Sequence, residues 1–514
     1  MSFQHDAEKP SPPLAPESEA RASHDTAPPK ALLDFMLQGW KAPDGKVPAP
    51  IKGHAVFAAR RRALSALFPG ETLLIPTGHE KVRANDTHYR FRPGTDFYYL
   101  TGNLEPDCVL CMDPLPEGGH RDVLFVEPNP GRSNATFYTD RKKGELWVGP
   151  RLGVEQSQAR FAVDACRGLD TLKETLAAFG KAGEAGHRFR ALRGVSSDVD
   201  VALPAQAERD RQFAAALSEM RLVKDAQEVR ELGRSIAATR RGFEDVIRAL
   251  KGAVSEREVE GVFNLRARVE GNDVGYNTIA ASGPNACILH WNRNDGRIRP
   301  GTLLLLDAGV EGHTLYTADI TRTLPVSGKL TAEQLEVYEL VLAAQRAAFK
   351  VIKPGADFME PNRAAMRILA QGLERLGILQ TSADEALKEE HQFYKRYSLH
   401  NVSHMLGLDV HDCAAARAEA YKFGKLKAGM VFTVEPGLYF QTDDLTVPAR
   451  YRGIGVRIED DVVVTPKGYR NLSKGIPSAP KDVEKWMAAL WRRAGTKSVT
   501  GARPPRTGPR KRQG

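Results

Sequence analysis

Residues 303–323 read LLLLDAGVEGHTLYTADITRT, and the interpretation of the whole chain starts from this stretch. The four leucines that lead into Asp307 predict a fully buried strand, and the alternating run that carries Asp319 predicts its half-polar partner. No lysine or arginine separates the two carboxylates. Burying a carboxylate costs so much free energy that the group pairs, takes up a proton or binds a cation. The stretch therefore indicates either salt-bridged structural aspartates or a cation site.

A second stretch repeats this pattern further along the chain. Residues 301–307 (GTLLLLD) and 429–435 (GMVFTVE) each have a glycine, five mostly apolar residues and an acid at the same offset. A further strand with an acid follows each of them, with Asp319 in the first half and Glu459 in the second. In each half, two helical patterns precede the acid-bearing strands. They cover residues 226–250 and 255–271 in the first half and residues 332–352 and 362–376 in the second. The repeat predicts a duplicated helix–helix–strand unit whose halves face each other.

Histidines gather between the two acid-bearing halves. His400, His404 and His411 lie within twelve residues of a chain that has 13 histidines in all, and they come just before Glu435. His290 ends an apolar run shortly before the first acid strand. A lone histidine is more often a hydrogen-bonded core or surface residue than a ligand, but a cluster in this place favours a functional site.

Two aspartates, two glutamates and one histidine would make a ligand set rich in oxygen. Arg457 could balance Glu459 as a structural ion pair, yet one arginine cannot neutralise four buried acids. Such a set suits Mn²⁺, with cobalt or zinc as substitutes, and two divalent ions would cancel the charge of four carboxylates. Two neighbouring ions can lower the pKa of a shared water molecule and polarise a carbonyl. Because the HExxH, GxSxG and Walker-type signatures are missing, the predicted chemistry is metal-assisted hydrolysis of an amide bond.

Composition limits the class of protein. The 514 residues are 42% hydrophobic and 27% charged, which is typical of a soluble globular protein with two or three domains. No apolar run approaches the roughly 18 residues of a membrane helix, and the first residues do not resemble a signal peptide. Five cysteines at irregular spacing indicate a reducing compartment, so we expect a cytoplasmic protein. Cys108 and Cys111 form a lone CxxC inside an apparent strand, with no second pair nearby, so we expect both to be core residues.

The charge is unevenly distributed. Six basic residues lie in the last eighteen positions, and without them the net charge of +9 falls to +3. We therefore expect a mildly basic body with a solvated tail, and we do not expect nucleic acid to be the main partner. Electrostatic tethering of the tail to a polyanion is a minor alternative.

The chain divides into four predicted segments. Residues 1–50 form a disordered proline-rich head and a short helix, and residues 51–219 a smaller α/β domain with strands at 72–75, 97–100, 108–112 and 123–126. Residues 220–480 form the catalytic domain, with strands expected also at 288–291 and 404–411. Residues 481–514 form a helix and the basic disordered tail.

The motifs of both domains resemble those of the pita-bread metallopeptidases, and among these the aminopeptidase P family. The resemblance covers roughly residues 54–475. It rests on YRFRPGTDFYYLTGNLEP (89–106), ELWVGPRLG (145–153), NACILHW (285–291), LLDAG (305–309), TADITRTLPV (317–326), SHMLGLDVHD (403–412), TVEPGLY (433–439) and YRGIGVRIEDDVVVT (451–465). It implies an α/β protein of two domains, the second a pseudo-twofold α+β pita-bread fold. It also implies hydrolysis of the peptide bond before proline by a hydroxide that bridges two metal ions.

The resemblance assigns the metal ligands. It implies a dinuclear site, usually manganese, held by Asp307, Asp319, His404, Glu435 and Glu459. By analogy Asp319 and Glu459 would bridge the two ions, Asp307 would hold one, and His404 with Glu435 the other. Glu435 would also help in proton transfer.

The resemblance also assigns residues that contact the substrate. His290 and His411 are similar to the family's substrate-binding and transition-state histidines, and His400 lines the pocket. Arg457 and Tyr439 resemble its supporting site residues. Asp96 matches an acidic residue that approaches the active site of a neighbouring subunit, in a family that forms dimers or tetramers.

Two departures and two alternatives accompany this hypothesis. Asp307 and Asp319 are twelve positions apart, one more than usual, which predicts a longer turn, and Asn401 replaces a small residue beside the pocket. A prolidase shares fold and ligands but accepts only dipeptides, and a metal-free pita-bread binding protein would lack catalysis. YRGIGVRIEDD and the serine of SHMLG favour the aminopeptidase.

Overall fold

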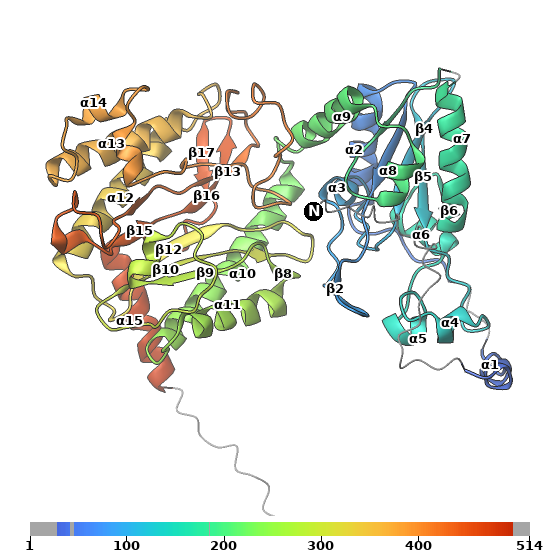
Figure 1. Cartoon of the computed structure of the whole chain (residues 1–514), viewed down its shortest axis with the longest axis horizontal. Coiled ribbons are helices and arrows are strands. Elements are labelled where there is room, and N and C mark those ends of the chain that lie inside the picture. Colours follow the sequence, from blue (N-terminus) through green and yellow to red (C-terminus); the bar gives the residue numbers. More distant parts are fainter. Residues whose placement is uncertain (1–27, 42–45, 185, 497–514) are drawn as a thin grey trace, which may run out of the picture. The chain divides into compact units, whose positions relative to one another are not determined.

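The computed structural model describes residues 28–41, 46–184 and 186–496, which form two compact units, residues 1–210 and 211–514 (Figure 1). The division falls inside helix α9 (Ala207–Met220), whereas the boundary predicted from the sequence, after residue 219, lies near the end of that helix. Most of the predicted disordered head and the whole of the basic tail lie outside the described residues. None of the described helices is long and apolar enough to cross a membrane.

The first unit is built on a five-stranded mixed sheet in the order β6-β5-β4-β1-β7. Its strands are β1 (Thr72–Pro76), β4 (Val109–Pro114), β5 (His120–Val126), β6 (Ala165–Gly168) and β7 (Phe189–Ala191). Cys108 and Cys111 are buried, the latter inside β4, as their apolar surroundings predict. The helices of this unit are α1 (Lys30–Met36), α2 (His54–Leu67), α3 (Thr95–Thr101), α4 (Thr136–Thr139), α5 (Glu145–Val148), α6 (Val154–Phe161), α7 (Leu172–Glu184) and α8 (Ser197–Ala202). A separate hairpin pairs β2 (Val82–Ala84) with β3 (Thr87–His88).

One predicted strand of this unit is wrong. Residues 97–100 form part of helix α3, not a strand. All residues of 97–101 are buried, so the segment has no alternation that separates a strand from a buried helix. Gly102 ends the helix with a left-handed backbone conformation (φ 68°), a common way for a helix to stop.

The second unit contains the predicted duplication. Helices α10 (Ala226–Leu250) and α11 (Glu256–Glu270) precede a three-stranded antiparallel sheet of order β12-β10-β9, and α12 (Ala332–Val351) and α13 (Glu360–Arg375) precede a second of order β13-β16-β17. In Figure 1 the strands lie between α10 and α11 on one side and α12 and α13 on the other. The sheet strands are β9 (Ile279–Ser282), β10 (Leu303–Ala308), β12 (Ile320–Pro325), β13 (Val431–Val434), β16 (Asp460–Thr465) and β17 (Gly468–Asn471). The smaller elements are β8 (Asp273–Val274), β11 (Val310–Glu311), α14 (Ala383–Leu387), β14 (Gly437–Tyr439), β15 (Gly455–Arg457) and α15 (Pro480–Thr496).

Local sequence starts these helices. Asp225 with Glu228 and Ser255 with Glu258 form capping boxes at the starts of α10 and α11. In each, a side chain accepts a hydrogen bond from a backbone N–H that the helix itself leaves unpaired, and one such cap contributes about 1 kcal/mol. The first two helices of the duplicated unit therefore begin where the sequence predicts.

Hydrogen bonds and an ion pair join the two halves next to the predicted acidic ligands. The amide of Glu459 donates to the carbonyl of Thr321 (3.1 Å), and Thr323 exchanges hydrogen bonds with the backbone of Arg457. The fully buried Arg322 donates to the carbonyl of Glu459 (2.6 Å) and forms an ion pair with Asp460 (2.7 Å). Strand β12 of the first half is thereby fixed against the acid-bearing segment of the second.

Two further predicted strands are loops. Residues 288–291 follow a 3-10 turn (Gly283–Cys287), and residues 404–411 form bends with one isolated antiparallel bridge, from Met405 to Phe432 of β13. At this bridge the amide of Leu406 donates to the carbonyl of Val431 (3.0 Å) and the amide of Thr433 to the carbonyl of His404 (3.0 Å), but the pairing does not extend into a ladder. Apolar content alone predicted strands here, and it does not distinguish a strand from a buried loop.

Candidate metal centre

Strand alternation in β10 delivers the first acid to the site. Leu304 and Leu306 belong to the core that packs on α10 and α11, so Leu305 and Asp307 point to the opposite face. Asp307 pairs in register with Thr321 of β12, and Asp319 directly precedes that strand. The run of leucines therefore aims a carboxylate away from its own core and towards the second half.

The second half supplies its acids at the ends of strands. Glu435 follows β13, and Glu459 lies in the short break between β15 and β16. The hydroxyl of Thr321 donates to Glu459 across the join between the halves (2.6 Å). Each half thus contributes two of the predicted carboxylates.

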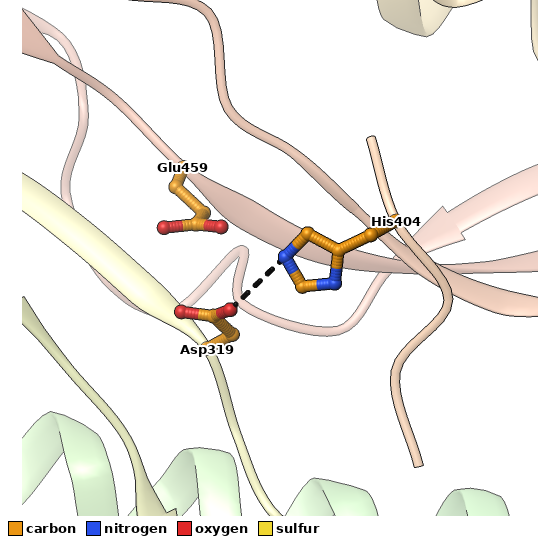
Figure 2. A group of neighbouring side chains, drawn as sticks. All are labelled: Asp319, His404 and Glu459. Atoms are coloured by element: carbon orange, nitrogen blue, oxygen red, sulfur yellow. Dashed lines mark ion pairs between the residues drawn. The ribbon is translucent and has the colours of Figure 1, made fainter. Parts of the chain in front are cut away.

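Three predicted ligands meet at one point. Asp319, His404 and Glu459 each offer a ligand atom, and these atoms lie within 4.8 Å of one another (Figure 2). The Nε2 atom of His404 is 3.3 Å from Asp319, while its Nδ1 lies 3.2 Å from the carbonyl of Met405. Because a carbonyl only accepts, Nδ1 carries a hydrogen and Nε2 faces the acids. This orientation is the one that histidine ligands of metals commonly show.

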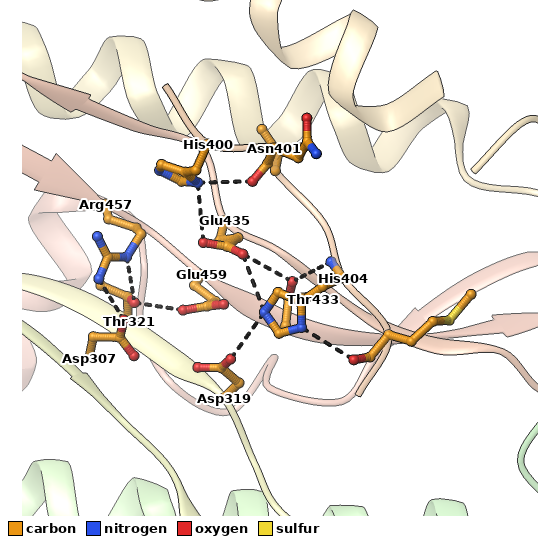
Figure 3. A network of polar contacts seen from close by, with 12 residues as sticks. Asp307, Asp319, Thr321, His400, Asn401, His404, Thr433, Glu435, Arg457 and Glu459 are labelled. Atoms are coloured by element: carbon orange, nitrogen blue, oxygen red, sulfur yellow. Dashed lines mark hydrogen bonds and ion pairs between the residues drawn. The ribbon is translucent and has the colours of Figure 1, made fainter. Parts of the chain in front are cut away.

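The other two predicted ligands lie on either side of this group. Glu435 is 3.4 Å from Nε2 of His404. Asp307 is linked to Asp319 through the hydroxyl of Tyr276, which donates to both carboxylates (2.6 and 2.5 Å). All five residues thus belong to one buried network, most of which appears in Figure 3.

The structural alternative expected an ion pair between Arg457 and Glu459, but Arg457 pairs with a different carboxylate. Its guanidinium forms an ion pair with Asp307 (2.5 Å) and donates to the hydroxyl of Tyr439 (2.9 Å). Both Arg457 and Asp307 are buried, and the pair crosses from one half to the other. The carboxylate of Glu459 instead accepts from a neutral hydroxyl, that of Thr321.

Burial leaves these acids with an excess of negative charge. It raises the pKa of Glu459 well above its usual range, and the neighbouring carboxylates raise this pKa further. Burial also raises the pKa of Asp319, although the hydrogen bond from His404 lowers it in part. For His404, burial lowers the pKa, but Asp319 and Glu435 outweigh that effect and raise it to about 9. Carboxylates and an imidazole that hold protons in this way form a donor set that suits a divalent cation.

A second layer of the predicted residues surrounds the ligands. Nε2 of His400 accepts from the hydroxyl of Tyr439 (2.7 Å), and its Nδ1 donates to the carbonyl of Asn401 (2.9 Å). Burial, then the charge of Arg457, lowers the pKa of His400 to about 4, so this ring is neutral at pH 7. The side chain of Asn401 points away from the acids in Figure 3.

The remaining predicted histidines border the same network. The ring of His411 lies edge-on to that of His404, with ring centres 4.4 Å apart. Burial lowers the pKa of His411, and the charges of His404 and His290 lower it further. The charge of His290 lowers the pKa of His400 as well, and His290 is exposed. Asp96 lies in the first turn of α3, in the other unit, and its assignment stays a prediction.

Sequence reasoning missed Tyr276. It precedes β9, in a segment that reads as an ordinary strand, and no spacing relates it to the acids. Only the antiparallel pairing of β9 with β10 brings its hydroxyl between Asp307 and Asp319. A single tyrosine in a predicted strand gives no comparable signal.

The chain matches known proteins over most of its length. The model of metallopeptidase family M24 matches residues 230–466, and that of the aminopeptidase P N-terminal domain matches residues 57–187. Xaa-Pro aminopeptidase 1 of Streptomyces coelicolor is 49% identical over 89% of this chain and 92% of its own length. The Xaa-Pro aminopeptidase of Escherichia coli is 33% identical over 84% of this chain and 97% of its own.

A solved structure agrees with these matches. Aminopeptidase P from E. coli with the inhibitor Pro-Leu superposes with a TM-score of 0.76 at 31% identity, over 86% of this chain and 100% of its own. The family match and the buried ligand group together support the use of a divalent metal. The chain therefore belongs to the aminopeptidase P family, whose catalytic domain is a metallopeptidase of family M24, and it is a metal-dependent aminopeptidase.

Proposed function

We propose that this enzyme removes the amino-terminal residue from peptides that have proline in the second position, and that it uses two Mn²⁺ ions. The observation that carries the proposal is the buried group of Asp319, His404 and Glu459, flanked by Asp307 and Glu435. The names of the relatives, Xaa-Pro aminopeptidases, support the choice of substrate.

The arrangement of the acids supports two ions. Asp319 and Glu459 lie at the centre of the network, with Asp307 on one side and Glu435 on the other, and all four carboxylates would contribute oxygen ligands to the metal centre. Asp307 would hold one ion, and His404 with Glu435 the other. When bound, the ions supply a nucleophile derived from water at neutral pH and polarise the carbonyl of the substrate.

The surrounding side chains orient the peptide and handle protons. We assign substrate binding to His290, His400 and His411, which border the ligand network. Glu435 lies 3.4 Å from Nε2 of His404 and beside the other proposed ligands, where a carboxylate could pass a proton to or from the reacting peptide. We therefore assign Glu435 a second role in proton transfer.

Two further side chains support the site through hydrogen bonds. Arg457 and Tyr439 connect Asp307 to His400 through a continuous series of hydrogen bonds, so we assign them a supporting role in catalysis. The series joins a proposed metal ligand to a proposed substrate-binding ring.

We propose a homo-oligomer, a dimer or a tetramer, in which Asp96 approaches the site of a neighbouring subunit. We also propose a cytoplasmic location, because all five cysteines are free in the structure, as expected in a reducing compartment.

The test compares a tripeptide Xaa-Pro-Yaa with the dipeptide Xaa-Pro, with Mn²⁺ added or chelated. We expect tripeptide hydrolysis that depends on Mn²⁺ and falls by at least about a hundredfold in Asp319→Ala, because this variant lacks a proposed metal ligand and loss of an outer-shell partner alone typically costs 10–100-fold. Asp482→Ala, which removes an exposed aspartate of α15, is the control. Activity confined to the dipeptide would identify a prolidase, and purified protein without bound metal would favour a binding protein.

A further inference from the structure

Glu256 is a buried carboxylate that the proposed chemistry does not use. It is fully buried and lies at the first position of α11, where the partial positive charge of a helix start favours an acid. Its two oxygens accept four hydrogen bonds, from the amide of Ser282 (2.7 Å), the side chain of Asn285 (2.9 Å), the indole of Trp291 (2.7 Å) and the amide of Gly296 (2.7 Å). All four donors are neutral and all belong to residues 282–296.

These four donors lie on both sides of His290 in the sequence. Two precede it in the chain and two follow it, so one carboxylate fixes both ends of the loop that carries the histidine. The backbone packs tightly against this carboxylate at Gly296, because a side chain there would begin 2.6 Å from an oxygen of Glu256. The segment has no strand pairing of its own between residues 288 and 291.

The second half of the molecule holds the other side of the same loop. The thiol of Cys287 donates to the carbonyl of Phe440 (3.2 Å), and Gln441 donates to the carbonyl of Cys287 (2.8 Å). His290 therefore lies between Cys287, held by the second half, and Trp291, held by Glu256 of the first. Its own side chain is exposed, so these neighbours determine where the ring lies.

We propose that Glu256 is a positioning residue for substrate binding: it fixes the loop 282–296 so that His290 presents its imidazole to the peptide. This inference rests on the proposed function, in which His290 binds substrate. Glu256 contacts none of the proposed metal ligands through the hydrogen bonds above, so its effect is expected on the peptide and not on the metal.

The main variant is Glu256→Gln. A glutamine keeps the shape but replaces one acceptor oxygen by an NH₂ group, which faces two of the four donors. We expect kcat/KM for an Xaa-Pro-Yaa peptide to fall about tenfold, mostly through KM, the factor expected when one hydrogen bond to a charged group is lost. Bound metal is expected to stay at the wild-type level.

The control is Glu258→Gln on the same helix. Glu258 closes the capping box by accepting from the amides of Val254 (2.6 Å) and Ser255 (3.2 Å), and glutamine serves equally well in that position. We expect kcat/KM within twofold of wild type. This control separates the loop contacts of Glu256 from a general effect on the start of α11.

A double-mutant cycle with His290→Ala decides whether Glu256 acts through the histidine. In the His290→Ala background we expect Glu256→Gln to change kcat/KM by less than twofold. An equal loss in both backgrounds, or no loss in the wild-type background, would overturn the proposal. Trp291→Phe removes one donor and leaves the carboxylate in place, and it replaces Glu256→Gln in the cycle if that variant does not fold.

Hydrogen–deuterium exchange tests the positioning without activity. We expect Glu256→Gln to lose protection at the amides of Ser282 and Gly296 and to keep it in β10. Unchanged protection would overturn the proposal. If His290→Ala leaves kcat/KM unchanged, the role of His290 in the proposed function fails, while the exchange result still decides whether Glu256 fixes the loop.

Discussion

Tyr276 places one hydroxyl hydrogen between two carboxylates that carry like charge. It donates to Asp307 and Asp319 at 2.6 and 2.5 Å, in a site where burial and both aspartates raise its own pKa well above the usual range. The hydroxyl therefore stays protonated at neutral pH and remains a donor. A fixed donor of this kind orients ligands that would otherwise repel each other.

Tyr276→Phe is expected to weaken metal binding. Loss of a group that orients the ligands typically costs 10–100-fold in metal affinity, so we expect the Kd for Mn²⁺ to rise by at least about tenfold. Isothermal titration calorimetry on the metal-free protein measures this change. Tyr469→Phe on β17, a half-exposed ring stacked on Phe349, is the control and is expected to leave the Kd unchanged. Equal affinities in the two variants would contradict the role of Tyr276.

Sequence marked the acids and histidines as candidates, and the family resemblance added Arg457 and Tyr439, but nothing in the sequence pointed to Tyr276 or Glu256. Asp307, Glu435 and His404 stand at marked places, after apolar runs or within a histidine cluster, and these marks are visible in one dimension. Tyr276 and Glu256 carry no such mark. Their contacts depend on the pairing of β9 with β10 and on a loop that returns to α11, and neither follows from spacing alone.

At the scale of elements, the connection between Asp307 and Asp319 is the critical turn. Gly309 lies directly after β10, and a Cβ built there would lie 1.7 Å from the carbonyl oxygen of Ala318. The amide of Ala318 donates to the carbonyl of Val310 (3.2 Å), which holds the two sides of the turn together. The close approach of the two backbones thus brings Asp319, directly before β12, towards Asp307 of β10.

Gly309→Ala is expected to separate these strands. The methyl group cannot be accommodated without moving the backbone beside Asp319, so we expect a loss of about 3 kcal/mol or more in the free energy of unfolding, together with weaker metal binding. Urea denaturation measures the first effect and calorimetry the second. Gly233→Ala in α10 meets nothing within 4 Å and is the control, with an expected gain of about 0.5–1 kcal/mol. A variant Gly309→Ala as stable as wild type would contradict this account.

Elements were predictable where periodicity or caps define them. The long helices α10 and α12 follow their amphipathic patterns and capping signals, and β10 follows its leucines. Buried segments without periodicity were not predictable: residues 97–100 are helical, and residues 288–291 and 404–411 are loops. In these segments, tertiary packing determines the conformation.

At the scale of the whole molecule, the metal-free enzyme is expected to become less stable as pH rises. The pKa of Glu435 is raised from 4.5 to about 7 and that of His404 from 6.5 to about 9. In both cases the folded protein keeps a proton that the unfolded chain has already lost. Stability therefore falls as pH rises from about 4.5 to about 9.

Saturating Mn²⁺ is expected to remove most of this dependence, because the ions replace the protons on the ligands. Thermal unfolding at pH 5, 7 and 9, with chelator or with Mn²⁺, measures both profiles. Metal should raise Tm most at pH 9. A chelated protein that gains stability between pH 5 and pH 9 would show that other groups dominate the titration.

The proposed ligands are divided between the two halves of the duplicated unit: Asp307 and Asp319 come from the first, and His404, Glu435 and Glu459 from the second. A metal ion bound by both halves is therefore a cross-link, and it disappears when the halves part. We expect the metal-free protein to be cut faster by an added protease between the halves than the loaded protein. A cell starved of the metal would then lose this peptidase by turnover as well as by inactivity, so that its abundance would follow the supply of the ion.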